Sequence, residues 1–261
     1  GRSERVVGEA LRQLPASRRP LLFSKFGLGD DSANRRKSGA AGDVVRECEA
    51  SLARLGVGRI DLFQLHWPAP EPIAETARAC AGLLAAGKIR AIGVCNVSVA
   101  QCQEWTATGT PLHSVQNPYS ILRQQAADEL LPWCFDHGTS FLAYSPLFRG
   151  LLHGTWKADK SFPPGDTRAE HKDYQGRRFQ RHLAAIEELR AIASADELSV
   201  AQLCVGALTC TPGLTGCIIG ARNAAQGTAI GELGMPITAR QLAAVEDIVA
   251  RLEADLAAMP T

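Results

Sequence analysis

Short apolar runs recur along the chain, and longer segments with apolar residues spaced three or four apart lie between them. The runs are continuously apolar and rich in β-branched and aromatic residues, which is typical of strands buried on both faces of a sheet. Six strands are predicted in this way, at residues 21–25, 60–66, 91–95, 114–118, 140–145 and 216–220. Strands that alternate with helices so regularly indicate a parallel sheet in an α/β protein.

Signals for helix ends fall between these strands. Three residues, Ser98, Ser199 and Thr238, each precede a Gln by three positions, and this pattern of a capping box predicts a helix start. Gly87 and Gly138 stand where helices should end, since glycine readily adopts the left-handed conformation found there.

Polar residues mark the ends of the predicted strands. Each of the six strands has one at or just past its carboxyl end: Lys25, His66, Asn96, Gln116, Tyr144 and Arg222. In a closed (β/α)₈ barrel the carboxyl ends converge on one mouth, where the active site lies. An open, doubly wound sheet would instead bind its ligand at one switch point, usually beside a G-x-G-x-x-G turn, which follows none of the six strands. The (β/α)₈ barrel is therefore the predicted fold.

The strand count is two short of that fold. Six strands would leave two open sheet edges. With about 30 residues per βα unit, the missing part would be roughly 40–60 residues. The chain begins directly on a predicted helix, with Ser3 as its expected N-cap. We therefore expect the first strand, first helix and second strand to precede residue 1, so that residues 1–261 form a single, N-terminally incomplete barrel domain.

Composition narrows the classes of partner. The chain is 46% hydrophobic and 21% charged, with a net charge of +1, which gives no electrostatic footprint for nucleic acid or an anionic membrane. No apolar run approaches the roughly 18–20 residues of a membrane span. The eight cysteines include no C-x-x-C pair, which favours reduced thiols over a disulfide framework or a zinc site. A cytoplasmic protein with a small-molecule substrate is expected.

Four stretches together carry a family resemblance: RLGVGRIDLFQLHWPAP, LLAAGKIRAIGVCNVS, SVQNPYS and LAYSPLFRGLLHG. The chain from its first residues to IIGARNAAQ resembles the aldo-keto reductases, which are (β/α)₈ oxidoreductases that use NADPH. The resemblance implies NADP(H)-dependent reduction of an aldehyde or ketone, or the reverse oxidation.

The resemblance also assigns two catalytic residues. The family's tetrad is Asp, Tyr, Lys and His, of which Lys25 and His66 match the last two, while the Asp and Tyr are expected ahead of residue 1. Hydride transfer builds negative charge on the carbonyl oxygen, and a Tyr with a pKa near ~10 needs a neighbouring ammonium to act as its acid at neutral pH. A neutral His would orient the carbonyl oxygen.

Further residues are implied to bind the cofactor or the substrate. Asn96 and Gln116 match the residues that hold the nicotinamide carboxamide, Cys95 stands where the family usually has Ser, and Tyr144 matches the aromatic that stacks on the ring. The loop that passes the cofactor diphosphate is matched by Ser145, Leu147, Arg149 and Gly150. The segment around the 2′-phosphate of the cofactor's adenosine is matched by Gly220, Arg222 and Gln226. Trp67 is expected at the substrate mouth. Ile230 replaces an Asn that usually lies near the adenine.

Other functions fit these residues less well or differ only in turnover. A metal-dependent hydrolase would need several His and carboxylates at strand ends, and His66 is accompanied by neither, so no metal site is predicted. Two alternatives stay open from the residues alone: an NADP-binding regulatory protein with little turnover, and an inactive relic. Taken singly, Lys25 would be a solvated surface residue and His66 a hydrogen-bonded core residue.

Overall fold

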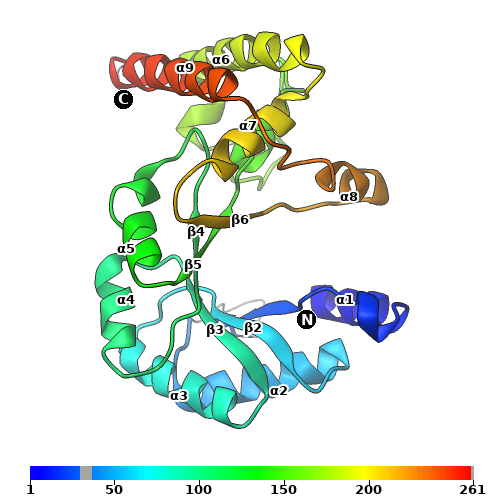
Figure 1. The fold of residues 1–261 in the computed structure, drawn as a ribbon, viewed down its shortest axis with the longest axis vertical. Coiled ribbons are helices and arrows are strands. Elements are labelled where there is room, and N and C mark those ends of the chain that lie inside the picture. The colour runs from blue at the N-terminus through cyan, green and yellow to red at the C-terminus, as the bar shows by residue number, and fades with distance from the viewer. Residues whose placement is uncertain (30–36, 260–261) are drawn as a thin grey trace. The chain divides into compact units, whose positions relative to one another are not determined.

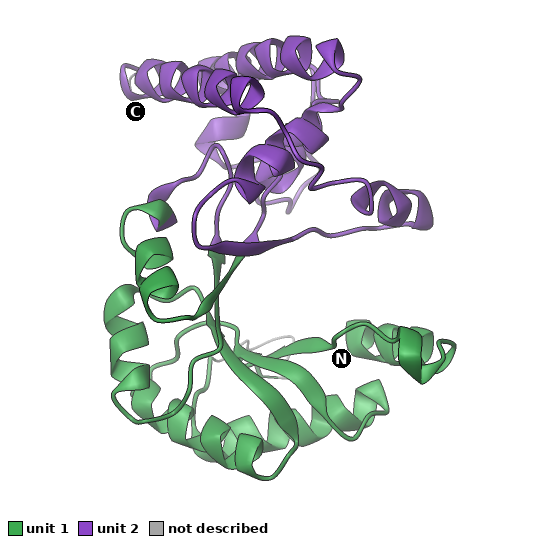
Figure 2. Ribbon diagram, viewed as in Figure 1, with its two compact units in different colours: residues 1–117, 127–142 green, residues 118–126, 143–261 purple. Residues whose placement is uncertain are grey.

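A computed structural model describes residues 1–29 and 37–259, in which helices alternate with parallel strands (Figure 1). The described chain divides into two compact units (Figure 2). Unit 1 comprises residues 1–117 and 127–142, and unit 2 comprises residues 118–126 together with the chain from residue 143 onward.

Unit 1 contains the first strands and the helices that follow them. Its strands are β1 (Phe23–Phe26), β2 (Ile60–Leu65), β3 (Ile89–Cys95) and β4 (Ser114–Pro118), and it includes the start of β5 (Ser140–Tyr144); they follow one another in chain order. Its helices are α1 (Arg2–Arg12), α2 (Ala41–Leu55), α3 (Ile73–Ala85), α4 (Val99–Thr106) and α5 (Leu130–Asp136), with a short 3₁₀ turn η1 (Ala16–Arg18). β1 to β4 pair in parallel, so their carboxyl ends lie at the same edge of the sheet.

A polar hydrogen bond crosses the middle of this sheet. Gln64 of β2 lies opposite Gly93 of β3, which lies opposite Ser114 of β4. The Gln64 Nε2 donates to the Ser114 Oγ at 3.3 Å, over the glycine between them. A Cβ at Gly93 would lie 2.2 Å from that Oγ, so a side chain at this position would clash with the Ser114 hydroxyl and disrupt the hydrogen bond. Glycine in a strand interior marks such close approaches.

Unit 2 is mostly helical. It contains the end of β5, β6 (Leu214–Ile218), and the helices α6 (Gly176–Ala195), α7 (Val200–Thr209), α8 (Ala224–Ile230) and α9 (Ala239–Ala257). Short 3₁₀ turns lie at η2 (Gln125–Ala127), which begins in this unit, η3 (Phe148–His153) and η4 (Lys172–Tyr174). α6 and α9 pack along each other (Figure 1), and buried apolar side chains such as Leu189 and Leu252 form their core.

The predicted elements are largely confirmed. Each predicted strand overlaps an observed one, and residues 114–118 match β4 in full. All three capping boxes form, at α4, α7 and α9. Gly87 and Gly138 have φ of 70° and 63° just past α3 and α5.

The predicted N-cap at Ser3 is wrong. α1 begins at Arg2 with Gly1 as its N-cap, because the Gly1 carbonyl already accepts a hydrogen bond from the Arg5 amide at 3.2 Å. Ser3 therefore lies inside the first turn, where its hydroxyl cannot cap the helix.

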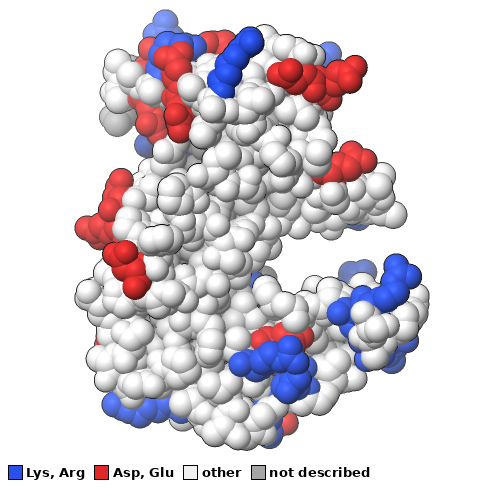
Figure 3. All heavy atoms as spheres, in the orientation of Figure 1, with Lys and Arg blue, Asp and Glu red and all other residues white. Residues whose placement is uncertain are grey.

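Several surface and core features bear on function. Figure 3 shows basic side chains gathered over α1, and both signs of charge over α6 and α9. All eight cysteines are free thiols, and six are buried. Within residues 1–29 and 37–259 no single helix is long and apolar enough to cross a membrane. In the same part of the chain, α6 and α7 together are long and apolar enough, judged from length and composition alone, but they are bent by 88° relative to each other.

Candidate active site

The carboxyl ends of β1 and β2 bring Lys25 and His66 together. Lys25 is the third residue of β1, and His66 follows β2 directly, with its amide bonded to the Phe26 carbonyl at 2.9 Å. Burial lowers the pKa of His66, and the positive charge of Lys25 lowers it further. The imidazole is therefore neutral at pH 7, in the form that can donate one hydrogen bond and accept another.

The same ammonium group acts on Cys95. Burial raises the pKa of the Cys95 thiol to about 12, although the charge of Lys25 opposes the rise. Lys25 thus lies within electrostatic reach of both the β2 and the β3 ends. Cys95 is fully buried and stays a neutral thiol.

A small polar pocket opens beside Lys25 and His66. Its volume is about 160 Å³, and its wall includes two carboxyl groups, those of Glu4 and Glu47. Burial alone would raise the pKa of Glu4, but hydrogen bonds from Ser24 and Arg54 outweigh it and lower the pKa. The Ser24 hydroxyl donates to Glu4 at 2.6 Å, which ties α1 to the strand that carries Lys25.

Asn96 connects three strand ends. Its side-chain Nδ2 donates to the His66 carbonyl at 2.9 Å, and its amide donates to the Gln116 carbonyl at 3.0 Å. It adopts a left-handed conformation with φ of 58°, which Asn tolerates better than most residues. Asn117, which no sequence pattern marks, fixes Val97, the residue after Asn96. Its side-chain oxygen accepts from the Val97 amide at 3.2 Å, and its side-chain nitrogen donates to the Val97 carbonyl at 2.9 Å.

Gln116 offers an acceptor for a nicotinamide group. Its Oε1 is buried and has no hydrogen-bond partner in the structure. An unsatisfied buried acceptor costs about 1–3 kcal/mol, and the N–H of a carboxamide bound there would satisfy it. Because Asn96 and Cys95 lie at the adjacent strand end, opposite Gln116, the residues present fit the carboxamide of a nicotinamide cofactor.

Trp67 lies next to His66 in the chain. Its side chain is 37% exposed, and the Lys37 ammonium stands over the ring at 4.8 Å from the centroid. A large exposed aromatic side chain at a strand end is available to contact a ligand.

The remaining predicted residues lie in unit 2, and the first group forms a strained turn. Tyr144 ends β5, half-buried, and its carbonyl accepts from the Tyr119 amide at 3.2 Å. Beyond it, Ser145, Phe148 and Arg149 have φ of 57°, 45° and 51°, and Gly150 has 103°. Non-glycine residues in this conformation cost about 1–3 kcal/mol each, and such residues cluster at ligand-binding sites. Leu147 is buried within this turn, whereas Arg149 is exposed.

The second group surrounds the start of α8. Gly220 and Arg222 are exposed, and the Arg222 amide donates to the Gln226 Oε1 at 2.8 Å. Asn223 caps α8 through the Gln226 amide at 2.9 Å. Gln226 therefore fixes the backbone that carries Arg222. Burial, and then the charge of Arg222, lower the pKa of His153, so this guanidinium lies within electrostatic reach of the last residue of η3. Ile230, at the end of α8, is half-buried.

Within unit 1 the structure thus brings Lys25, His66, Cys95, Asn96 and Gln116 to one sheet edge. Within unit 2 it places Arg222 within electrostatic reach of the last residue of η3. The roles assigned to all these residues stay predictions. Among the described residues, no cluster of His, Cys, Asp and Glu could hold a metal ion.

Comparison with known proteins defines the class that this fold and site represent. The model of the aldo/keto reductase family matches residues 1–250. The chain belongs to the aldo/keto reductase family. The solved structure of glycerol dehydrogenase AKR11B4 from Gluconobacter oxydans is similar over 95% of this chain and 77% of that one, with 34% identity and a TM-score of 0.89. The structural neighbours are (β/α)₈ barrels, which agrees with the predicted fold class.

The chain also matches three curated relatives, over a smaller share of their length than of the solved structure. The chain is 35% identical to aldo-keto reductase YhdN of Bacillus subtilis, over 89% of this chain and 71% of that protein. It is 34% identical to the NADH-specific methylglyoxal reductase of Escherichia coli, over 78% of this chain and 65% of the relative. It is 28% identical to aldo-keto reductase yakc [NADP(+)] of Schizosaccharomyces pombe, over 78% and 61%. The chain therefore spans about two thirds of the length of these relatives.

Proposed function

We propose that the protein reduces an aldehyde or ketone to the alcohol, or catalyses the reverse oxidation, with NADP(H) as its cofactor. The observation that carries this proposal is the neutral imidazole of His66 beside the Lys25 ammonium, at a polar pocket on the same sheet edge as Gln116. A nicotinamide bound there supplies the hydride. The pairing of a neutral hydrogen-bonding ring with a fixed positive charge suits a reaction in which a carbonyl oxygen becomes negative.

In the proposed reaction the two residues act on different atoms. Lys25 favours the ionised form of the catalytic Tyr that the family resemblance implies, which brings the pKa of that Tyr closer to neutrality and makes it a better proton donor and acceptor. His66 donates a hydrogen bond to the carbonyl oxygen and orients it. Asn96 holds the backbone that carries the His66 ring through its 2.9 Å hydrogen bond to the His66 carbonyl.

The choice of NADP(H) rests on Arg222. A guanidinium matches the geometry of a phosphate, and this one is exposed on a backbone held by Gln226. The relatives differ in the cofactor that their names state: NADH for the E. coli protein and NADP(+) for the S. pombe protein. The buried thiols and the family membership support a cytoplasmic enzyme that acts on small molecules.

The test compares Lys25→Met and His66→Gln with the wild type in the full-length protein. Lys25→Met keeps most of the stem volume and removes the charge, so single-turnover oxidation of NADPH by a simple aldehyde should slow by about 10²–10⁴-fold. NADPH affinity and the melting temperature should stay near wild type. Variants that melt early but turn over normally per folded molecule would show that both residues are structural. Wild-type protein that binds NADPH tightly yet reduces no aldehyde would favour the regulatory alternative.

A further inference from the structure

A long connection packs against the strained turn of unit 2. We call residues 155–175 the strap. Its Trp156, Phe162 and Tyr174 form a cluster of edge-to-face contacts, with ring centroids 5.3 to 6.0 Å apart. The Arg168 guanidinium lies over the Phe162 ring at 4.8 Å. The strap therefore has an aromatic core of its own, which gives its polar side chains defined positions.

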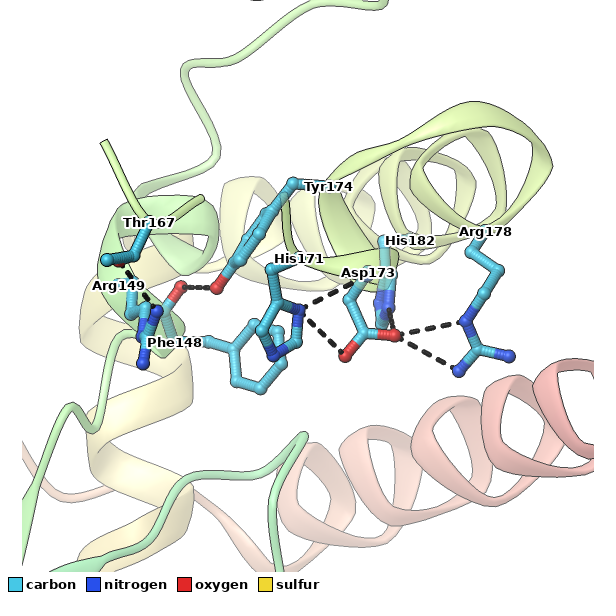
Figure 4. Close-up of polar contacts among 8 residues, drawn as sticks. All are labelled: Phe148, Arg149, Thr167, His171, Asp173, Tyr174, Arg178 and His182. Atoms are coloured by element: carbon cyan, nitrogen blue, oxygen red, sulfur yellow. Dashed lines mark hydrogen bonds and ion pairs between the residues drawn. The ribbon is translucent and has the colours of Figure 1, made fainter. Parts of the chain in front are cut away.

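Two of those polar side chains donate hydrogen bonds to consecutive carbonyls of the turn. The Tyr174 hydroxyl donates to the Phe148 carbonyl at 3.1 Å (Figure 4), and the Arg168 Nη1 donates to the Arg149 carbonyl at 3.0 Å. Phe148 and Arg149 are the two adjacent non-glycine residues with left-handed backbones. A third contact runs the other way, since Arg149 Nη1 donates to the Thr167 Oγ1 at 3.2 Å.

Both donors are themselves fixed. The Asp166 carboxylate accepts hydrogen bonds of 2.6 to 3.2 Å from the Arg168 guanidinium. These bonds fix the orientation in which the guanidinium donates to the turn. Tyr174 follows Asp173, whose carboxylate lies between His171, His182 and Arg178 (Figure 4). Arg178 also donates to the Leu256 carbonyl at 2.8 Å. The contacts that restrain the turn are thus anchored in α6 and α9.

We propose that Tyr174 and Arg168 are positioning residues for cofactor binding: they hold Phe148 and Arg149 in the conformation in which this turn accepts the cofactor diphosphate. The inference rests on the proposed function, because the turn is the segment expected to pass the diphosphate. Left-handed residues persist only when their surroundings over-determine them. The strap supplies that restraint from outside the turn, and neither donor needs to touch the cofactor.

Tyr174→Phe is the sharpest variant. It removes one hydroxyl, keeps the aromatic cluster and changes no charge, so any loss of affinity cannot come from weaker attraction to phosphate. Dissociation constants for NADPH and NADH should both rise by about five- to tenfold, since both cofactors contain the diphosphate. The KM for the cofactor should rise with them while kcat at saturation stays near wild type. Hydrogen exchange at the amides of 148–150 should be faster in the free variant.

Arg190→Lys is the matched control. Arg190 donates to the Gly154 carbonyl, just before the strap, and this bond lies outside the turn at Phe148 and Arg149. Arg190→Lys should lower the melting temperature about as much as Tyr174→Phe does, yet leave the dissociation constants for NADPH and NADH unchanged. Unchanged binding in Tyr174→Phe, or equal weakening in Arg190→Lys, would overturn the inference while the proposed function stands. A wild-type protein that binds neither cofactor would overturn the proposed function and this inference with it.

Discussion

The side-chain amide of Asn96 donates a hydrogen bond to the main-chain carbonyl of His66, with 2.9 Å between nitrogen and oxygen. Asn96 makes this bond from a left-handed backbone, φ 58°, so two separate properties of the residue matter. Asn96→Gly loses the hydrogen bond but keeps the conformation, whereas Asn96→Ala loses both. We expect the free energy of unfolding to be lower for Ala than for Gly by about 1 kcal/mol, measured by urea denaturation. Equal values would mean that the backbone strain is relieved elsewhere.

The neutral state of His66 predicts a pH dependence of stability. Its pKa is lowered in the folded protein by burial and by Lys25, whereas the unfolded value is near ~6.5. The unfolded chain therefore binds a proton more readily. The contribution of neutral His66 to the free energy of unfolding is therefore fully present above pH ~6.5, and it is lost as the pH falls toward the lower pKa of His66 in the folded protein. His66→Gln should flatten the free energy of unfolding between about pH 7 and 5, where the ordinary carboxyl groups remain ionised. A profile as steep as wild type would contradict the assigned shift.

Arg222 should discriminate between the two nicotinamide cofactors. Its guanidinium is exposed, and its backbone is held by Gln226. A charge-assisted contact with a phosphate contributes about 1.5–3 kcal/mol, so Arg222→Ala should weaken NADPH binding by about ten- to hundredfold and leave NADH binding unchanged. Fluorescence titration with each cofactor measures this. Arg240→Ala is the control, because it removes the same charge from an exposed position in the first turn of α9 and should change neither affinity. Equal losses for both cofactors in Arg222→Ala would refute the role.

Any side chain at Gly93 is expected to destabilise the protein. A Cβ there would lie 2.2 Å from the Ser114 Oγ and 2.9 Å from the Gln64 Cγ. Gly93→Ala should therefore cost about 1–3 kcal/mol of stability through overpacking, measured by thermal or urea unfolding. The double variant Gly93→Ala with Ser114→Ala should recover part of the loss, because it removes the nearer atom. Strict additivity of the two single changes would argue against the clash.

Thiol reactivity should follow burial. Cys210 is exposed, Cys217 is partly exposed with its pKa raised to about 11 by burial, and the other six cysteines are buried. A thiol reagent at pH 8 should modify one cysteine quickly in the native protein, and Cys210→Ser should abolish that phase. All eight thiols should react after denaturation. A fast phase that survives in Cys210→Ser would place the reactive thiol elsewhere.

Much of the fold could be predicted because its signals are local. The capping boxes at Ser98, Ser199 and Thr238 depend on residues three positions apart, and all three form. Ser3 offers the same local signal at α1, but the Gly1 carbonyl begins the helical hydrogen bonding two residues earlier, so the helix starts ahead of the predicted N-cap. A capping residue is thus informative only where the preceding backbone does not already continue the helix.

The site was predictable in part, and for a different reason. Lys25, His66, Asn96 and Gln116 follow from strand ends and family motifs, which the sequence displays directly. The contacts made by Asn117, Arg168 and Tyr174 join residues 19 to 26 positions apart, and no periodic pattern marks them. In the sequence the strap is a mostly polar stretch with two adjacent prolines and one glycine at 163–165, which signals a loop but gives no sign of its aromatic core.

The aromatic core of the strap also gives the molecule an optical label. The chain has four tryptophans, of which Trp105 and Trp133 are buried in unit 1 and Trp67 follows β2. Trp156 is the tryptophan of the strap, and its ring lies 3.2 Å from the position that a Cβ on Gly150 would take. The emission of a protein that retains Trp156 and carries Phe at the other three positions would report the environment beside the turn, so movements of this segment could be followed in solution without an attached dye.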